Sequence, residues 1–255
     1  AMLLHNTDNV HITNNSFMDL GGNAIFVNKY NRHVKITTNH FQRIGASAIC
    51  FVGSPDAVRS PSFEYHQFVP FEELDREAGP KTDDYPSECL VYDNLIHQIG
   101  TIEKQVAGVQ ISMASEITLS HNTIYNLPRA GINISEGTWG GHIIEHNDVF
   151  NTVLETGDHG SFNSWGRDRC WHPERERMDE IITKENALIL LDAQKTTIIR
   201  NNRFRCYHGW DIDLDDGSTN YHIYNNLCLN GGIKLREGFY RMVENNIMVS
   251  NSFNP

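Results

Sequence analysis

A single short phrase recurs along the 255 residues of this chain and limits the folds open to it. It consists of an apolar residue, two variable positions, an asparagine, one variable position and a second apolar residue, as in Ile12-Asn15-Phe17. Successive asparagines lie 20 to 28 residues apart, except for two gaps of 55 residues. Such a short unit at a near-constant period indicates a repeat architecture. The phrase asparagines are Asn15, Asn39, Asn94, Asn122, Asn147, Asn202, Asn226 and Asn246.

The segments around these asparagines alternate apolar and polar residues, as in VHITNNSF and VKITTNHF. This is the two-residue period of a β-strand, and helical periodicity is largely missing. Short strands with a turn asparagine in every unit predict an all-β fold, a right-handed parallel β-helix (solenoid) of about eight coils. We expect the asparagine side chains to stack inside the solenoid, each amide bonding the next.

The two wide gaps predict long loop insertions at about residues 54–86 and 166–192 of a single β-helix domain that spans 1–255. The first is rich in proline, aromatic and acidic residues, which favours an ordered loop over a groove. The second contains RERMDEIITKENALILL, where we expect a short helix. The alternative is that both are solvated decorations. Because neither end shows a capping element, we expect a module that is tethered to other domains of a larger protein.

Charge and composition argue against several classes of partner. The formal net charge of -11 disfavours nucleic acid and anionic membranes, which both attract clustered Lys and Arg. No apolar run approaches the roughly 18 residues of a membrane span. The five cysteines form an odd count without zinc-site spacing, so we expect small buried hydrophobic residues rather than a disulfide framework.

A second strand precedes each asparagine phrase and usually begins near Ala or Gly. Because alternate residues of a strand face opposite sides, stacking these strands predicts one inward and two outward columns. The inward column reads Ile25, Ile49, Val109, Ile132, Phe162, Ile212 and Ile233. One outward column reads Phe26, Cys50, Gln110, Asn133, Asn163, Asp213 and Lys234. The other reads Asn28, Val52, Ser112, Ser135, Trp165, Asp215 and Arg236, with Glu136, Asp216 and Glu237 beyond it.

The stretch GWDIDLDDGSTNY gathers acids on this outward surface, with Asp213 and Asp215 on one face of a strand. Adjacent coils lie about 4.8 Å apart and residues i and i+2 about 6.6 Å apart. These lengths resemble the carboxyl separations of glycosidases, and crowding raises the pKa of one carboxylate. The preceding coil adds Asp158, His159 and Asp168 as further catalytic candidates. A single histidine is more often structural, but one inside such a cluster favours catalysis.

Candidate binding residues surround these acids. Trp165 offers a flat face for a sugar ring, although exposed aromatic residues also cap solenoid edges. Asp-rich turns also bind calcium, so calcium is possible, but no cofactor is required and the metal is unknown. The candidate substrate-binding residues are Trp165, Asn163, Asn133, Gln110, Lys234, Arg236, Glu237 and Trp210.

With the motifs GDHGSFNSWGRDR, WDIDLDDGS and GGIKLREG, the chain resembles right-handed parallel β-helix carbohydrate-active proteins, most closely glycoside hydrolase family 141 and related β-helix modules. The resemblance implies two aspartates on the β-helix face that act on plant cell-wall glycans, as in a xylanase or an α-L-fucosidase. By position, Asp158 or Asp168 would pair with Asp213 or Asp215. It also implies a secreted or extracytoplasmic protein.

Three functions are compatible with these features. The first is binding and hydrolysis of a xylan-like plant cell-wall polysaccharide with paired aspartates. The second is a non-catalytic xylan-type carbohydrate-binding module attached to a glycoside hydrolase. The third is a calcium-dependent polysaccharide lyase or epimerase, in which Lys234 and Arg236 neutralise a uronate.

Overall fold

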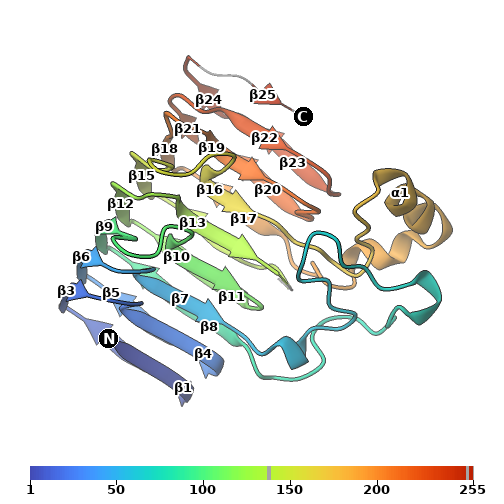
Figure 1. The fold of residues 1–255 in the computed structure, drawn as a ribbon, viewed down its shortest axis with the longest axis horizontal. Helices are drawn as coiled ribbons and strands as arrows, with labels where there is room; N and C mark the ends of the chain where they lie inside the picture. The colour runs from blue at the N-terminus through green and yellow to red at the C-terminus, as the bar shows by residue number, and fades with distance from the viewer. Residues whose placement is uncertain (137–138, 251–252, 255) are drawn as a thin grey trace.

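The computed structural model describes residues 1–136, 139–250 and 253–254. It shows a stack of coils whose parallel strands form three faces around one core (Figure 1). Each complete coil adds one short strand to each face, and all strand pairs are parallel. The first face, which carries the outward columns, comprises β1 (Met2–Asp8), β4 (Ile25–Arg32), β7 (Ile49–Val52), β10 (Ala107–Ser112), β13 (Ala130–Ser135), β16 (Gly160–Ser164), β19 (Trp210–Leu214), β22 (Ile233–Leu235) and β25 (Phe253–Asn254).

The other two faces close the coils. The second face comprises β2 (His11–Thr13), β5 (Lys35–Thr37), β8 (Pro86–Tyr92), β11 (Ser115–Ser120), β14 (Ile143–Glu145), β17 (Thr197–Arg200), β20 (Tyr221–Tyr224) and β23 (Arg241–Glu244). The third comprises β3 (Ser16–Leu20), β6 (His40–Ile44), β9 (Leu95–Ile99), β12 (Thr123–Tyr125), β15 (Asp148–Phe150), β18 (Arg203–Arg205), β21 (Leu227–Cys228) and β24 (Ile247–Met248). The predicted parallel β-helix is therefore confirmed.

The core fills the interior of the coils. The predicted inward column pairs in the expected register, for example Ile132 with Phe162 and Phe162 with Ile212. All seven side chains of this column are fully buried. All five cysteines are free and buried, in the coils or in the insertions, which confirms the expectation of small buried residues. None of the described helices is long and apolar enough to cross a membrane.

The phrase asparagines form a continuous ladder, as the sequence predicts. The backbone N–H and the Nδ2 of each asparagine donate to Oδ1 of the next one at 2.9 to 3.2 Å, from Asn15 to Asn246. The residue before each ladder asparagine is left-handed, with φ between 51° and 59°. This conformation is tolerated best by Asn, Asp and His, which occupy most of these positions. The ladder thus fixes the same tight turn in coil after coil.

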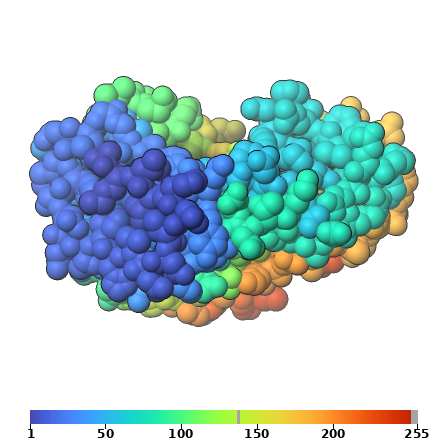
Figure 2. All heavy atoms as spheres, turned by 90° about the horizontal axis from the view of Figure 1, so that it is seen from below, coloured from blue at the N-terminus to red at the C-terminus, as the bar shows by residue number. Residues whose placement is uncertain are grey.

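Two insertions leave the stack after the first face and pack against each other. Residues 53–85 contain η1 (Pro55–Ala57) and η2 (Phe71–Glu73), whereas residues 165–196 contain α1 (Arg175–Lys184) and η3 (Asn186–Leu190). The helix expected in the second insertion is therefore present. We call the two insertions together the lobe. Figure 2 shows the lobe beside the coils, with a hollow between them. The lobe has its own apolar core, formed by Leu74, Cys170, Ile181 and Leu188.

Candidate functional site

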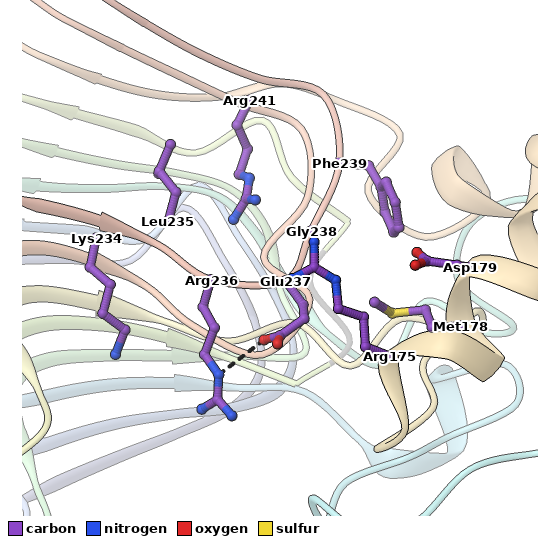
Figure 3. Close-up of a pocket in the computed structure, with 10 residues that line it drawn as sticks. All are labelled: Arg175, Met178, Asp179, Lys234, Leu235, Arg236, Glu237, Gly238, Phe239 and Arg241. Carbon is purple, nitrogen blue, oxygen red and sulfur yellow. Dashed lines mark ion pairs between the residues drawn. The ribbon is translucent and has the colours of Figure 1, made fainter. Parts of the chain in front are cut away.

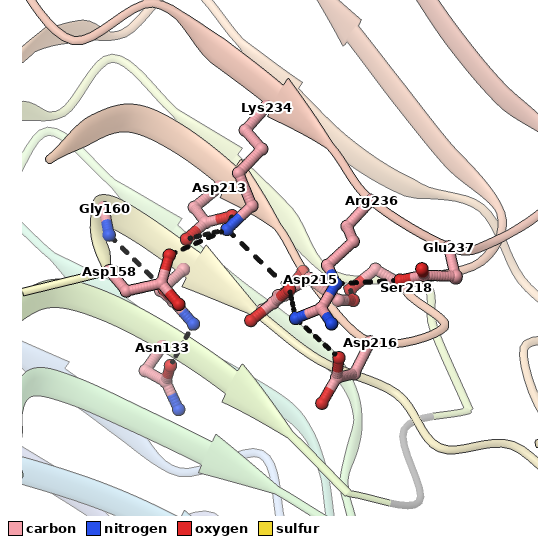
Figure 4. A network of polar contacts seen from close by, with 12 residues as sticks. Asn133, Asp158, Gly160, Asp213, Asp215, Asp216, Ser218, Lys234, Arg236 and Glu237 are labelled. Atoms are coloured by element: carbon pink, nitrogen blue, oxygen red, sulfur yellow. Dashed lines mark hydrogen bonds and ion pairs between the residues drawn. The ribbon is translucent and has the colours of Figure 1, made fainter. Parts of the chain in front are cut away.

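Strand register brings the predicted polar column together on the first face. Asn133 pairs with Asn163, Asn163 with Asp213, and Asp213 with Lys234. Gln110 lies one coil earlier and accepts a hydrogen bond from Asn133 Nδ2 at 3.0 Å. Figure 4 shows Asn133, Asp213 and Lys234 on one surface, with Asp158 beside them. Residues that are about 100 positions apart in the sequence thus form a single site.

Asp213 lies at the centre of the site beneath Lys234. Lys234 Nζ lies 3.1 Å from Asp213 Oδ1, 3.8 Å from Asp215 Oδ1 and 3.3 Å from Asp158 Oδ1. The Asp213 side chain is fully buried. Burial raises the pKa of Asp213 to about 7, against the opposing charge of Lys234 and with support from the charge of Asp215. This carboxyl group therefore retains its proton to a much higher pH than an ordinary aspartate does.

Asp215 and Asp216 follow on the same strand end and are held by arginines. Arg236 Nη1 lies 3.1 Å from Asp215 Oδ1 and 3.2 Å from Asp216 Oδ1. Its Nε lies 3.0 Å from Glu237 Oε2. Although burial opposes the shift, the charges of Asp215 and Asp216 raise the pKa of Arg236. Asp215 is therefore an ion-paired carboxylate, and it lies beside Asp213, whose pKa is raised.

Asp211 has a different role from its neighbours. Its side chain is buried, and its carboxylate accepts hydrogen bonds from backbone N–H groups of Cys206, Asn230, Gly231 and Gly232 at 2.7 to 3.1 Å. These bonds tie consecutive coils together. The four clustered aspartates therefore divide into one structural residue and three residues on the first face.

Asp158 and His159 enter the site from the turn before β16. Asp158 has a left-handed φ of 54°, and its side chain is 78% exposed. His159 accepts or donates one hydrogen bond, between Nδ1 and Thr156 Oγ1 at 3.2 Å. Burial, together with the charge of Arg129, lowers the pKa of His159 to about 4. His159 is therefore a neutral imidazole at physiological pH and can accept a proton.

A hollow of about 220 Å³ opens beside these groups and is lined by His159, Trp165, Arg129, Arg167 and Asp215, with Asn163 and Asp216. Trp165 donates from Nε1 to Glu136 Oε1 at 2.7 Å. The Arg129 guanidinium lies over the Trp165 ring, 5.3 Å from its centroid. The indole that the sequence suggested as a sugar platform is therefore held between an arginine and a carboxylate.

The lobe forms one wall of this hollow. Arg167 Nη2 pairs with Asp216 Oδ2 at 2.9 Å, and its Nη1 donates to the backbone carbonyl of Phe63 at 2.9 Å. Tyr65 lies near Arg236, with its ring centroid 6.0 Å from the guanidinium carbon. The first insertion thus contacts the two arginines that pair with Asp215 and Asp216.

Two further hollows border the site. One of about 420 Å³ is lined by Asp158, Trp210 and His208, and Lys234 Nζ lies 5.8 Å from the centroid of the Trp210 ring. The other, of about 350 Å³, lies beneath α1 and is bordered by Lys234, Arg236 and Glu237 (Figure 3). Trp210, Arg236 and Glu237 therefore lie at the margins of the Asp213 cluster.

Asp168 is the one catalytic candidate that lies apart from the others. Its side chain is 4% exposed and lies within the lobe, next to Arg169 and Asp192. Burial and the charge of Asp192 raise its pKa well above the ordinary value. None of its described hydrogen bonds reaches Asp213 or Asp215. Of the aspartates that the resemblance suggests as a partner for these two acids, the structure brings only Asp158 to them.

Three residues at the site were absent from the candidates chosen from the sequence, namely Arg129, Arg167 and Asp216. Asp216 shares the acid-rich stretch, and Arg167 belongs to the motif GDHGSFNSWGRDR. Arg129 immediately precedes β13, just as His159 immediately precedes β16 on the next coil. Both residues lie in turns that precede these strands, outside the repeated strand pattern, so the pattern gave no indication of Arg129. Within 1–136, 139–250 and 253–254, no group of three or more His, Cys, Asp or Glu side chains is placed to hold a metal.

Comparisons with known proteins agree with this fold. The sequence model of the right-handed β-helix region matches residues 3–170. A solved structure titled glycoside hydrolase superposes with a TM-score of 0.54 at 11% identity, over 96% of this chain and 36% of that one. The mannuronan C-5 epimerase AlgE4 A-module of Azotobacter vinelandii superposes with a TM-score of 0.52 at 14% identity, over 99% of this chain and 56% of that one. The chain thus spans between about a third and just over half of these structures. No curated protein matches it in sequence.

Proposed function

Because the chain belongs to the right-handed β-helix family, we propose that its first face is a polysaccharide-processing site that hydrolyses a xylan-like plant cell-wall glycan. One observation carries the proposal. Asp213 lies in β19 and Asp215 follows its last residue, and burial raises the pKa of Asp213 to about 7 while Asp215 is paired with Arg236. Two carboxyl groups with different environments are the arrangement that divides acid and base roles in glycoside hydrolysis.

In this proposal, Asp213 donates its proton to the leaving glycosidic oxygen, and Asp215 acts as the nucleophile or as the base that activates water. Asp213 becomes accessible when Lys234 moves away from it. Asp158 offers Lys234 an alternative partner, because its exposed carboxylate already lies 3.3 Å from Nζ. His159, Trp165 and Asn163 line the space in which the sugar would lie.

A second function is favoured by one specific observation. His159 has a pKa of about 4 and lies beside the cationic Arg129, so a neutral base adjoins a cation. A lyase or epimerase of uronates needs this combination, because the base removes a proton from the carbon next to the carboxylate. Calcium dependence belongs to this candidate and is tested by chelation.

Product analysis on a panel of xylans, pectins and alginates separates these functions. We expect products with new reducing ends and water added across the broken bond. Unsaturated uronate ends would instead identify a lyase, and altered sugars in an uncleaved chain would identify an epimerase. Binding to a glycan without any product would contradict the hydrolase proposal and support a carbohydrate-binding module.

The variants Asp213→Asn and Asp215→Asn should each lower hydrolysis by about a hundredfold or more. Asp19→Asn is the matched control, because Asp19 is an exposed, ion-paired aspartate on the third face, 2.6 Å from Arg43. It should leave the rate unchanged. We propose in addition that the protein is secreted or extracytoplasmic and that this single β-helix domain is joined to other domains.

A further inference from the structure

Arg129 is a buried cation without a counterion of its own. Its side chain is 4% exposed, and it makes no side-chain hydrogen bond or ion pair among the described residues. Its guanidinium carbon lies over the Trp165 ring, 5.3 Å from the centroid. Of the five N–H donors of its guanidinium, the one on Nε is buried and has no partner among the described residues, which is unfavourable out of water. Such a group is commonly retained because a ligand satisfies it.

The carboxylates nearest to Arg129 are already occupied. Glu136 accepts from Trp165 Nε1 at 2.7 Å through Oε1, and from Ser112 Oγ at 3.1 Å through Oε2. Asp213 is paired with Lys234. Burial lowers the pKa of Arg129 to about 10, against the charges of Asp213 and Glu136, so the group remains charged at neutral pH. Its charge is therefore available to a molecule that enters the hollow.

The other charges of the hollow are balanced within the protein. Arg167 pairs with Asp216, and Arg236 bridges Asp215 and Asp216. An anion entering the hollow would thus face one unpaired guanidinium rather than a general positive surface. A planar guanidinium binds a carboxylate through two parallel hydrogen bonds, which makes the match specific.

We propose that Arg129 binds the carboxylate of a uronic acid residue, so that the glycan recognised by this site is acidic. The inference rests on the proposed polysaccharide site and names its substrate class. It places the uronate in the hollow beside His159 and Trp165, next to the reacting acids. A xylan that carries uronic acid substituents would satisfy both this inference and the proposed hydrolysis.

The test compares each acidic polysaccharide with its own carboxyl-reduced form, which keeps the chain and removes the charge. The probes are glucuronoxylan, homogalacturonan and alginate, with binding measured by isothermal titration calorimetry. We expect the wild-type protein to bind at least one acidic glycan about tenfold or more tightly than its reduced form. Arg129→Gln should bring this ratio close to one while preserving affinity for the reduced glycan. Arg43→Gln, an exposed arginine on the third face, should keep the wild-type ratio.

Three results would overturn the inference. The first is that no acidic glycan binds more tightly than its carboxyl-reduced form, which includes the case that none binds. The second is that Arg129→Gln keeps the wild-type ratio of the two affinities. The third is that sulfated dextran binds more tightly than any uronate glycan. Arg129→Gln should also have a Tm at or above that of the ligand-free wild type, because it removes a buried, unpaired charge. A Tm several degrees lower would assign Arg129 a structural role instead. A preference for the acidic glycan without hydrolysis would contradict only the proposed function. Equally fast hydrolysis of the acidic glycan and its carboxyl-reduced form would contradict only this inference.

Discussion

At the scale of single residues, the site depends on a carboxyl group whose environment opposes ionisation. Asp213 is surrounded by the coil stack and Lys234, and the amide of Asn163 lies 3.2 Å from its Oδ2. The same burial that prepares Asp213 as an acid also destabilises its charged form in the folded protein. Function and stability are therefore coupled at this position.

This coupling predicts the pH dependence of stability. Burial raises the pKa of Asp213 in the folded protein to about 7, from an ordinary value of 3.8. Because the folded pKa is raised, the stability that this group contributes at low pH is lost as pH rises from about 4 to about 7. The loss amounts to about 4 kcal/mol. Urea unfolding gives the free energy of unfolding of Asp213→Asn relative to that of wild type. This difference should be larger at pH 8 than at pH 4 by roughly the same amount.

Asp19→Asn provides the control for this measurement. The hydrogen bond from Arg43 lowers the pKa of Asp19, so its titration lies below this pH window. Asp19→Asn should therefore follow the wild-type slope between pH 4 and pH 8. Equal slopes for wild type and Asp213→Asn would show that Asp213 ionises normally in the folded state.

At the scale of elements, the ladder and the strand register could be predicted from the sequence, whereas the turn before each first-face strand could not. The ladder repeats one local pattern, and the two-residue period decides which side chains face outward. Arg129 and His159 instead lie in turns whose lengths vary from coil to coil. Asp168 belongs to the same motif as His159 and Trp165, GDHGSFNSWGRDR, but β16 ends at Ser164 and the chain enters the lobe.

The ladder predicts a gradient of stability along the coil stack. Asn122 is buried and donates from Nδ2 to Val91 O and Asn147 Oδ1 at 3.0 and 2.9 Å, and it accepts from the backbone of Asn94 at 3.0 Å. Asn122→Ala should therefore lower the free energy of unfolding by about 2 to 4 kcal/mol, because it leaves buried groups unsatisfied. Asn15→Ala, at the exposed end of the ladder, should cost clearly less in the same denaturant titration. Similar losses at both positions would contradict the predicted gradient of stability along the ladder.

At the scale of the whole molecule, the lobe positions one wall of the site through contacts that no repeat could have revealed. Arg169 is buried and pairs with Asp192 at 2.5 Å, and its Nη1 donates to the backbone carbonyls of Asp75 and Glu77 at 2.8 and 2.6 Å. These contacts join two insertions that are more than 90 residues apart in the sequence. Composition indicated an ordered loop, but the partners of Arg169 depend on the tertiary fold.

Removing the contacts of Arg169 should destabilise the lobe and leave the coils folded. Arg169→Ala leaves the buried charge of Asp192 without its counterion, which should lower the local stability of the lobe by about 3 to 5 kcal/mol. Hydrogen–deuterium exchange should become faster in residues 59–79 and 170–192, with no change along the asparagine ladder. Arg177→Ala, which removes a 60% exposed arginine of α1, should change neither region. Faster exchange throughout the coils would mean that the lobe and the coils unfold as one unit.

The pH dependence of kcat/KM for glycan hydrolysis, measured for the wild type and for Lys234→Gln, tests the role of Asp213 most directly. A general acid must be protonated, so the wild-type rate should fall above a pH of about 7. The charge of Lys234 lowers the pKa of Asp213, so Lys234→Gln should move this fall to higher pH. A fall at the same pH in both proteins, or a rate that does not decrease through pH 7, would contradict the assignment of Asp213 as the acid.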